Sequence, residues 1–350
     1  MIVIVDCMGG DKAPLEVVKG AYAASLEYNA NFILVGDKAE ILRIADEEEM
    51  DLRRFDIVDA PLTIEMTDPP LAVMKAKKDS SMNVALTMLA EGKGDALVST
   101  GNTGALFTGA TLIVRKIKGD KRAAIASILP MSPPVLLLDS GANITVTPAY
   151  LEQFAIMGSI YMHKIHGLSA PRVGLLNNGA EETKGTELQL EAYKLLSDSP
   201  ALNFVGNVEA NMVPKDACDV LVTDGFTGNV LLKSIEGMGK LMLRTMKDIF
   251  YSDTLAKISG LLIKRKINDI KAVFDPNEHG GAPILGISKP VIKAHGSSNA
   301  KAVKNAIRQA IAYADSGVIY SIARETKLFM PSHSPRSEED KTLSASVREK

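Results

Sequence analysis

The run Ala96-Leu-Val-Ser99 leads directly into the turn Thr100-Gly-Asn-Thr-Gly104, and these two segments decide the fold. A short apolar run without alternation is typical of a strand that is covered on both faces, as in a parallel sheet. The turn then opens a helix-like stretch at Ala105. A buried strand that ends in a glycine-rich turn predicts an α/β sheet with ligands bound beyond the carboxyl ends of its strands.

The same kind of apolar run recurs along the chain, with helix-like segments in between. The runs are Ile2 to Val5, Phe32 to Val35, Val135 to Leu138, Val173 to Leu176 and Val220 to Val222. They predict a three-layer α/β/α doubly wound sheet with crossover helices, built as one large domain over residues 1–330. We expect the polar loops that follow these runs to lie along one edge of that sheet.

Two segments depart from this rhythm. Residues 237–275 read as a continuous helical projection, because they contain no strand-like run. Residues 331–350 are rich in Ser and in charge, so this tail is expected to be disordered.

Composition excludes several classes of function. Lys and Arg number 40 against 42 Asp and Glu, Trp is absent, and aromatic residues make up 5%, which argues against a nucleic-acid partner. Cys7 and Cys218 are the two cysteines and no His-x-x-x-His pair occurs, so neither a disulfide framework nor a metal site is expected. With no secretion signal and no run of about 18 apolar residues, we expect a cytoplasmic protein.

Two of the polar loops suit an anionic ligand. The turn Ser99, Gly101, Asn102, Thr103 and Gly104 can aim backbone N–H groups at phosphate, although it also fits a tight turn capped by Asn102 or Thr103. Lys184, which follows the run Val173 to Leu176, can neutralise phosphate or an oxyanion, although an ion pair with a neighbouring Glu is the alternative.

Two later loops add polar donors. Asn229 can donate its amide to a carbonyl or phosphate oxygen and Asp224 can orient a cation or a hydroxyl, but both also fit turn and cap chemistry. His295 and Ser297 lie in a Gly- and Ser-containing loop, where Ser298 or Asn299 can cap the helix that begins near Ala300. A lone His, such as His279 or His295, is more often structural than catalytic.

Taken together, these loops closely resemble the bacterial phosphate acyltransferase family PlsX, in order from residue 1 to about 325. The motifs are Asp6-Cys-Met-Gly-Gly-Asp11, Lys77-Lys-Asp-Ser-Ser-Met82, Val98-Ser-Thr-Gly-Asn-Thr-Gly-Ala-Leu106, Leu138-Asp-Ser-Gly-Ala-Asn143, Gly174-Leu-Leu-Asn-Asn-Gly-Ala-Glu-Glu-Thr-Lys-Gly185, Asn207-Val-Glu209, Asp224-Gly-Phe-Thr-Gly-Asn-Val-Leu-Leu-Lys233 and Lys293-Ala-His-Gly-Ser-Ser-Asn-Ala-Lys301. Ser140 and Asn178 stand where the family often has Val and Ile.

The resemblance implies a phosphate:acyl-carrier-protein acyltransferase with an isocitrate dehydrogenase-like and phosphotransacetylase-like fold. It implies a homodimer without metal or organic cofactor, which feeds acyl phosphate into phospholipid synthesis and so to an acylglycerol-phosphate acyltransferase. Lys184, Asn229 and His295 are then expected at the reacting centre. The residues expected in the substrate cleft are Ser99, Gly101, Asn102, Thr103, Gly104, Asn143, Asp224, Gly228, Ser297, Ser298 and Asn299.

Such a reaction needs charge stabilisation more than acid–base catalysis. Phosphate is already ionised near neutral pH, and a thiol with a pKa of about 8.5 leaves readily as thiolate. Fixed cations and amide donors must instead stabilise the negative charge that develops on the thioester oxygen. Lys184 and Asn229 are the residues that we expect to do so.

The projection has three possible partners. Its basic residues Lys257, Lys264, Arg265 and Lys266 suit acidic acyl carrier protein, and its apolar face with Leu255, Ile258 and Leu262 suits either an anionic membrane or a dimer partner. A membrane contact would place the protein on the inner face of the cell membrane. The alternative functions are a dehydrogenase of the same fold, a phosphotransacetylase acting on a coenzyme A ester, and a non-catalytic module that holds acyl chains or carrier protein.

Overall fold

The computed structural model of the chain describes residues 1–263, 265, 266, 278 and 280–329. Within these ranges one sheet of eleven strands runs in the order β3-β2-β1-β4-β11-β10-β5-β6-β9-β7-β8. The strands are β1 (Ile2–Asp6), β2 (Asn31–Gly36), β3 (Phe55–Asp59), β4 (Ala96–Ser99), β5 (Ala124–Leu129), β6 (Val135–Leu138), β7 (Arg172–Asn177), β8 (Asn203–Glu209), β9 (Val220–Val222), β10 (Gly281–Leu285) and β11 (Val291–Ala294).

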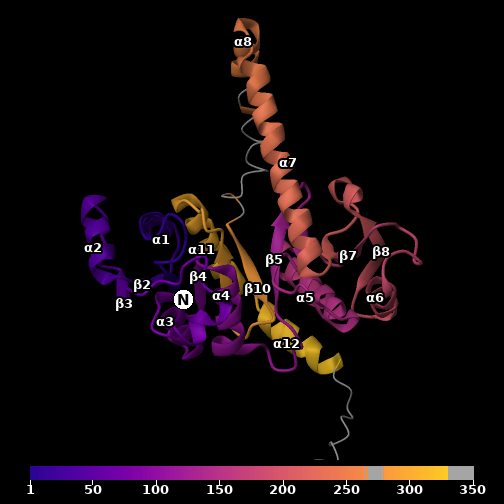
Figure 1. The fold of residues 1–350 in the computed structure, drawn as a ribbon, viewed down its shortest axis with the longest axis horizontal. Coiled ribbons are helices and arrows are strands. Elements are labelled where there is room, and N and C mark those ends of the chain that lie inside the picture. The colour runs from indigo at the N-terminus through magenta and orange to yellow at the C-terminus, as the bar shows by residue number, and fades with distance from the viewer. Residues whose placement is uncertain (264, 267–277, 279, 330–350) are drawn as a thin grey trace, which may run out of the picture.

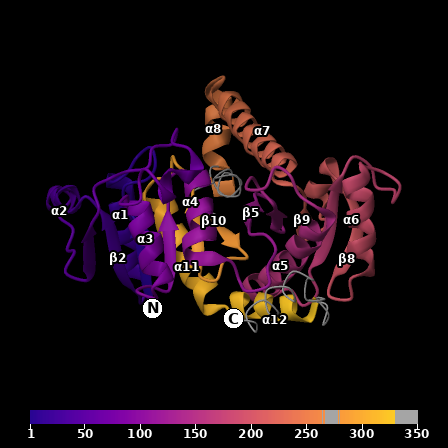
Figure 2. The same ribbon diagram turned by 60° about the horizontal axis from the view of Figure 1, so that its bottom comes forward.

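Helices cover both faces of the sheet, so the predicted three layers are confirmed (Figures 1 and 2). One face packs against α1 (Leu15–Glu27), α2 (Lys38–Glu47), α5 (Pro148–His166), α6 (Glu187–Asp198), α11 (Ala300–Asp315) and α12 (Val318–Phe329). On the other face lie α3 (Ser81–Ala90), α4 (Thr103–Gly109) and the helical turn Ala110–Arg115. Val3 and Val5 belong to the first core and Ile4 to the second, so β1 is buried on both sides.

All six apolar runs form strands, and five further strands are present in the described residues. The edge strands β3 and β8 were missed because they are only partly buried, so polar residues interrupt their apolar pattern. The central strands β10 and β11 are short and contain Gly, Pro or Lys, which weakens the strand signal.

The prediction that the polar loops lie along one sheet edge is wrong. Antiparallel pairings flank β10 and β5, so β6, β9, β7 and β8 run opposite to β1 to β4 and β11. The two halves of the sheet lie on either side of this junction (Figure 2). Five steps separate β4 from β9, and a twist of roughly 20–25° per step turns β9 by roughly 100–125°. This rotation allows the loops of both halves to converge on the middle of the molecule.

The segment predicted to project begins inside a longer helix. The first turns of α7 (Gly225–Tyr251) pack against the loop after β6, and the later part of α7 stands away from the sheet together with α8 (Thr254–Leu262) (Figure 1). Asp224 starts α7 because its carboxylate accepts hydrogen bonds from Thr227 N and Oγ1, at 2.8 and 2.7 Å. The helix continues through Gly237, whose cost in a helix interior is only about 1 kcal/mol.

Parts of two predictions fall on residues that the structure does not describe, namely the end of the projection at 264 and 267–275, and the tail 331–350. In the described part of the chain, no helix combines the length and apolar character needed to cross a bilayer.

Candidate active site

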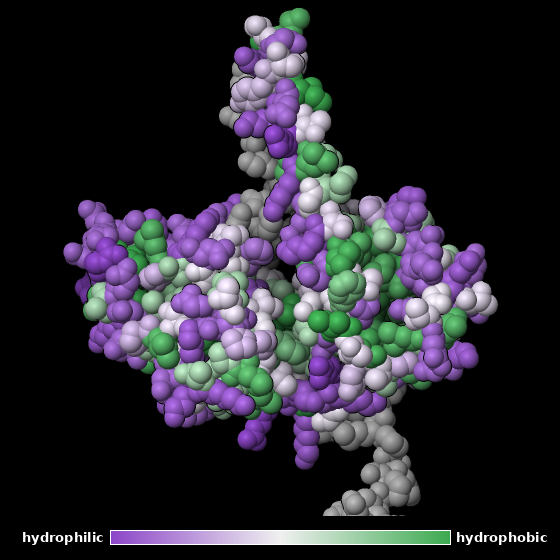
Figure 3. All heavy atoms as spheres, viewed as in Figure 1, coloured by the Kyte–Doolittle hydropathy of each residue, from purple (hydrophilic) through white to green (hydrophobic). Residues whose placement is uncertain are grey.

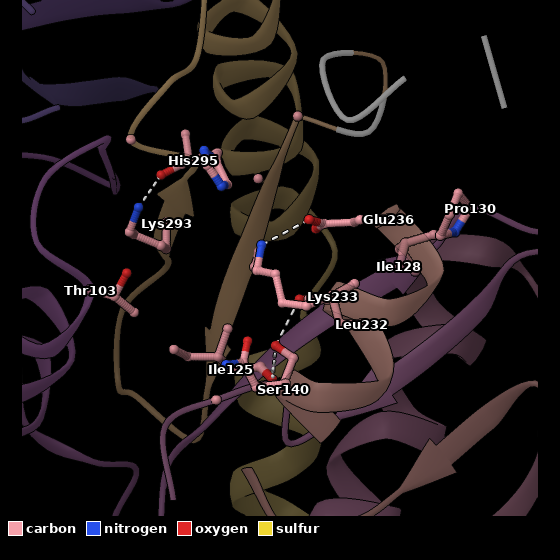
Figure 4. Close-up of a pocket in the computed structure, with 18 of the residues that line it drawn as sticks. Thr103, Ile125, Ile128, Pro130, Ser140, Leu232, Lys233, Glu236, Lys293 and His295 are labelled. Atoms are coloured by element: carbon pink, nitrogen blue, oxygen red, sulfur yellow. Dashed lines mark hydrogen bonds and ion pairs between the residues drawn. The ribbon is translucent and has the colours of Figure 1, made fainter. Parts of the chain in front are cut away.

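A cavity of about 450 Å³ lies where the two halves of the sheet meet (Figure 4). Its walls come from elements far apart in the sequence: β5, the loops after β1, β4, β6 and β11, the start of β10, and one face of α7. The residues of α7 on the cavity are Asn229, Leu232, Lys233, Glu236 and Lys240. Their spacing of three to four residues places them on one helix face.

One side of the cavity is cationic. Lys293 is buried, and its ammonium donates a hydrogen bond to Ala294 O. Lys233 reaches into the cavity from α7, and its Nζ lies 2.8 Å from Glu236 Oε2 (Figure 4). With Lys240, these lysines give the site positive charge that suits an anionic ligand, and His295 lies beside them.

Burial and neighbouring charges set the protonation of this side. Burial lowers the pKa of Lys293 to about 8, an effect that Lys233 reinforces and Asp11 opposes. The pKa of His295 is also lowered, first by burial and then by Lys233 and Lys293. Ser297 N donates to His295 Nδ1 at 3.2 Å, so the neutral ring carries its proton on Nε2.

The other side of the cavity is apolar. Ile125 and Ile128 come from β5, Pro130 follows that strand, and Leu232 comes from α7. Figure 4 shows Ile128 and Pro130 on the side away from Thr103, Lys293 and His295. The cavity therefore offers an apolar surface beside a cationic one.

The backbone next to Asn229 is positioned by close packing between α7 and the loop after β6. The Asp139 carboxylate accepts hydrogen bonds from the backbone N–H groups of Gly141, Ala142 and Asn143, which shapes this loop. Gly228 lies so close that a Cβ there would be 2.0 Å from Asp139 O. The exposed side chain of Asn229 lies at the cavity wall beside Gly141, with Oδ1 3.7 Å from the position of a Cβ on that glycine.

In the turn after β4, the side chains of Ser99 and Asn102 bond to other parts of the protein. Ser99 Oγ donates to the buried Asp6 carboxylate at 2.6 Å, and Asn102 Nδ2 donates to the carbonyls of Glu65, Met66 and Asp68 at 3.1, 3.0 and 3.0 Å. Asn102 Oδ1 also caps α4. The turn packs closely against its neighbours, since a Cβ on Gly101 would lie 2.6 Å from Met82 Cε and one on Gly104 would lie 2.9 Å from Pro70 Cγ. Of this predicted group, Thr103 lines the cavity.

Several other predicted substrate residues use their polar atoms within the protein. Asn143 Nδ2 donates to Ala123 O and Asp139 Oδ2, both at 2.8 Å. Asp224 and Asn299 cap α7 and α11 through their side chains. Ser297 Oγ lies 2.9 Å from His295 Nδ1, whereas the buried Ser298 Oγ has no hydrogen-bond partner among the described residues. These residues shape the site, and the cavity wall is formed by others.

Lys184 does not line this cavity. It is exposed on the loop after β7, which is held by hydrogen bonds from Asn177 Nδ2 to Lys184 O at 3.1 Å and from Asn207 Nδ2 to Glu181 O at 2.8 Å. Because β7 pairs with β9, this loop and the start of α7 follow neighbouring parallel strands. The structure brings Asn229 and His295 to one cavity, while the predicted role of Lys184 stays a prediction.

The loop patterns did not predict Lys233, Glu236 and Lys293 as cavity residues. The first two belong to a stripe with Asn229 that repeats at helical spacing, a signal that was available once α7 was known to begin at Gly225. Lys293 lies in the otherwise apolar strand β11, where a buried cation is unusual.

The predicted contact residues of the projection are exposed where the structure describes them. Leu255 is 77% exposed and Ile258 is 52% exposed, and Figure 3 shows hydrophobic residues along one flank of the projection. Lys257, Arg265 and Lys266 are exposed as well. Lys264 and the side chain of Leu262 lie outside the described residues.

The chain matches a family model described as "Fatty acid synthesis protein" over residues 1–321. It is 44% identical to a phosphate acyltransferase of Thermoanaerobacterium thermosaccharolyticum, over 94% of this chain and 97% of that protein. It is 45% identical to the phosphate acyltransferase of Acetivibrio thermocellus, over 93% of this chain and 96% of that protein.

Solved structures support the fold. A phosphotransacetylase from Streptococcus pyogenes superposes with a TM-score of 0.59 at 17% identity, covering 90% of this chain and 94% of its own. The EutD phosphotransacetylase from Staphylococcus aureus gives a TM-score of 0.57 at 15% identity, with the same coverage. At such low identity these likenesses concern the fold alone.

Proposed function

The chain belongs to the fatty acid synthesis protein family, whose relatives at 44% and 45% identity are phosphate acyltransferases, and on this premise we propose its substrates and mechanism. It transfers a long-chain acyl group from acyl carrier protein to inorganic phosphate, releasing acyl phosphate and the free carrier protein. One observation carries this proposal: a single cavity combines a cationic side, an amide donor and an apolar side. These are the requirements of a phosphate nucleophile, a developing oxyanion and an acyl chain.

The reaction is a direct phosphorolysis. A phosphate oxygen held near Lys233, Lys293 and His295 attacks the carbonyl carbon of the thioester, and a C–O bond forms. Asn229 donates its amide hydrogen to the oxyanion of the tetrahedral intermediate. The C–S bond then breaks and sulfur leaves with the electron pair as thiolate. Since phosphate is already ionised, the protein supplies placement and charge rather than a strong base.

The apolar side receives the acyl chain. Ile128, Pro130 and Leu232 lie within the same cavity as the lysines, so a chain on this surface has its carboxyl end beside the phosphate. The removal of this apolar surface from water, at about 25 cal/mol per Å², favours long chains.

The projection contacts an anionic membrane in this proposal. Leu255 and Ile258 are exposed next to Lys257, which combines an apolar surface with positive charge at one end of the molecule. The protein would then act peripherally on the inner face of the membrane, where acyl phosphate is used for phospholipid synthesis. We also propose that two copies of the chain form a homodimer.

Thiol release tests the substrate directly. The protein is incubated with palmitoyl carrier protein, with and without phosphate, and free thiol is followed over time. We expect release that depends on phosphate and that is faster with the carrier protein than with palmitoyl coenzyme A. A preference for the coenzyme A ester would indicate a phosphotransacetylase, and tight binding without thiol release would indicate a non-catalytic carrier-binding protein.

A further inference from the structure

A carboxylate lies among the cations of the cavity. Glu236 shares the cavity face of α7 with Asn229 and Lys233, and Figure 4 shows its side chain directed at the Lys233 ammonium. Its side chain is only 20% exposed, and Oε2 lies 2.8 Å from Lys233 Nζ. A negative group at this position weakens the attraction of the site for anions in general.

The same carboxylate distinguishes between anions by their protons. Inorganic phosphate keeps at least one proton near neutral pH and can donate a hydrogen bond, whereas sulfate has the same shape and carries no proton. An ionised carboxylate only accepts hydrogen bonds. It therefore stabilises a protonated oxyanion and repels a fully deprotonated one, because an acceptor that faces another acceptor in a partly buried site is left without a partner.

We infer that Glu236 is the residue that selects phosphate over sulfate at this site, by accepting a hydrogen bond from the phosphate O–H while Lys233 and Lys293 hold its anionic oxygens. The inference rests on the proposed function and concerns the same cavity. It identifies Glu236 as a specificity-determining residue whose charge lowers general anion affinity in exchange for discrimination.

A second acidic residue, Asp11, also lines the cavity but is arranged differently. It is exposed, and its backbone N–H donates to Gly296 O at 2.8 Å, which fixes it in the loop after β1. Within the described residues, one ion pair is found between an acidic residue and a lysine of this cavity, and it joins Glu236 to Lys233. The substitution D11N is therefore the matched control, because it removes one negative charge from the same cavity and leaves the proposed acceptor in place.

The test measures anion binding to the full chain without acyl substrate. Dissociation constants for phosphate, sulfate and arsenate are determined by calorimetry near neutral pH at constant ionic strength, for the wild type, E236Q, D11N and K233Q. In the wild type we expect phosphate and arsenate, both protonated, to bind much more tightly than sulfate. In E236Q the sulfate-to-phosphate ratio of dissociation constants should fall about 10- to 100-fold, as expected for a hydrogen bond to a charged group.

The two controls separate this effect from charge alone. D11N should leave the ratio within about threefold of the wild type, and K233Q should weaken both anions while keeping the ratio. If E236Q keeps the wild-type ratio, or if D11N lowers it as far as E236Q does, the assignment to Glu236 is overturned. Circular dichroism of each variant verifies folding, and Glu236→Asp provides a second variant that retains the charge but shortens the reach.

The inference and the proposed function fail in different ways. Phosphate-dependent thiol release in a wild type that binds sulfate as tightly as phosphate would contradict the role of Glu236 and leave the acyltransfer intact. Selective phosphate binding without thiol release would contradict the acyltransfer and leave the selectivity intact.

Discussion

Asn229 is the fifth residue of α7 and follows Gly228, where the helix packs closely against the loop after β6. We predict that Asn229→Ala lowers kcat by about 100- to 1000-fold, the usual cost of losing one oxyanion donor. Thiol release at saturating phosphate and acyl carrier protein measures this effect. Val230→Ala is the control and should retain wild-type turnover, because Val230 is the next residue of α7 and does not line the cavity. Full activity of the Asn229 variant would exclude its amide from the reaction.

Lys184→Ala belongs in the same assay, because Lys184 is exposed outside the cavity. A loss comparable to that of Asn229→Ala would mean that the loop after β7 reaches the reacting centre when substrate is bound. Unchanged turnover would mean that Lys233 and Lys293 supply the positive charge at the reacting centre.

The lowered pKa of Lys293 predicts that the use of phosphate depends on pH. Burial lowers its pKa to about 8, with Lys233 acting in the same direction and Asp11 and Asp6 opposing it. The ammonium is charged below this pH and neutral above it, so kcat/KM for phosphate should fall as the pH rises through about 8. A pH profile of initial rates measures the fall. In Lys293→Met the activity should be low at every pH, and the fall near pH 8 should disappear. A fall that persists in this variant would assign the titration to another group.

At the scale of elements, Asn102 joins the loop after β3 to the start of α4. Its amide donates to three carbonyls and its oxygen caps the helix. We predict that Asn102→Ala lowers the free energy of unfolding by about 1–3 kcal/mol, from the lost cap and the carbonyls left without a donor. Urea unfolding measures the change. Asn102→Asp keeps the cap but sets a carboxylate against the three carbonyls, so a fully stable aspartate variant would argue against this clamp.

The projection carries exposed apolar side chains that suit contact with a partner. Leu255→Glu places a charge in the apolar surface next to Lys257, and we predict that it reduces flotation of the protein with anionic liposomes. Leu26→Glu is the matched control, because Leu26 is 70% exposed on α1, away from the projection. Liposome binding that is unchanged in Leu255→Glu would argue against the membrane role, and a change in oligomeric state instead would assign this face to the dimer.

At the scale of the whole molecule, the cavity joins the two halves of the sheet. A ligand that binds there contacts both, so it should stabilise the fold as one unit. Phosphate at about 100 times its dissociation constant should add about 2.7 kcal/mol to the free energy of unfolding and raise the Tm. Thermal unfolding in phosphate and in chloride of equal ionic strength measures the difference. Lys293→Met should lose most of the shift, and an equal shift in both proteins would place the phosphate elsewhere.

The site was only partly predictable from the sequence, because the antiparallel junction at β10 and β5 brings together segments that are far apart in the chain. Asn229 and His295 were found because each follows a strand in a recognisable loop, and both line the cavity. Ser99 and Asn102 stand in equally recognisable loops, yet their polar atoms bind Asp6 and three backbone carbonyls. A local pattern identifies a polar side chain at a strand end, but it does not identify the partner of that side chain.

The sequence by itself determined the α/β class, the six buried strands and the family resemblance, because a strand covered on both faces must be apolar at successive positions and this requirement is local. Only the tertiary structure decided that the two sheet halves run in opposite directions and that Lys233, Glu236 and Lys293 share one cavity with Asn229. These features depend on which strands pair and how far the sheet twists between them, and such long-range pairings leave no periodic signal in the chain.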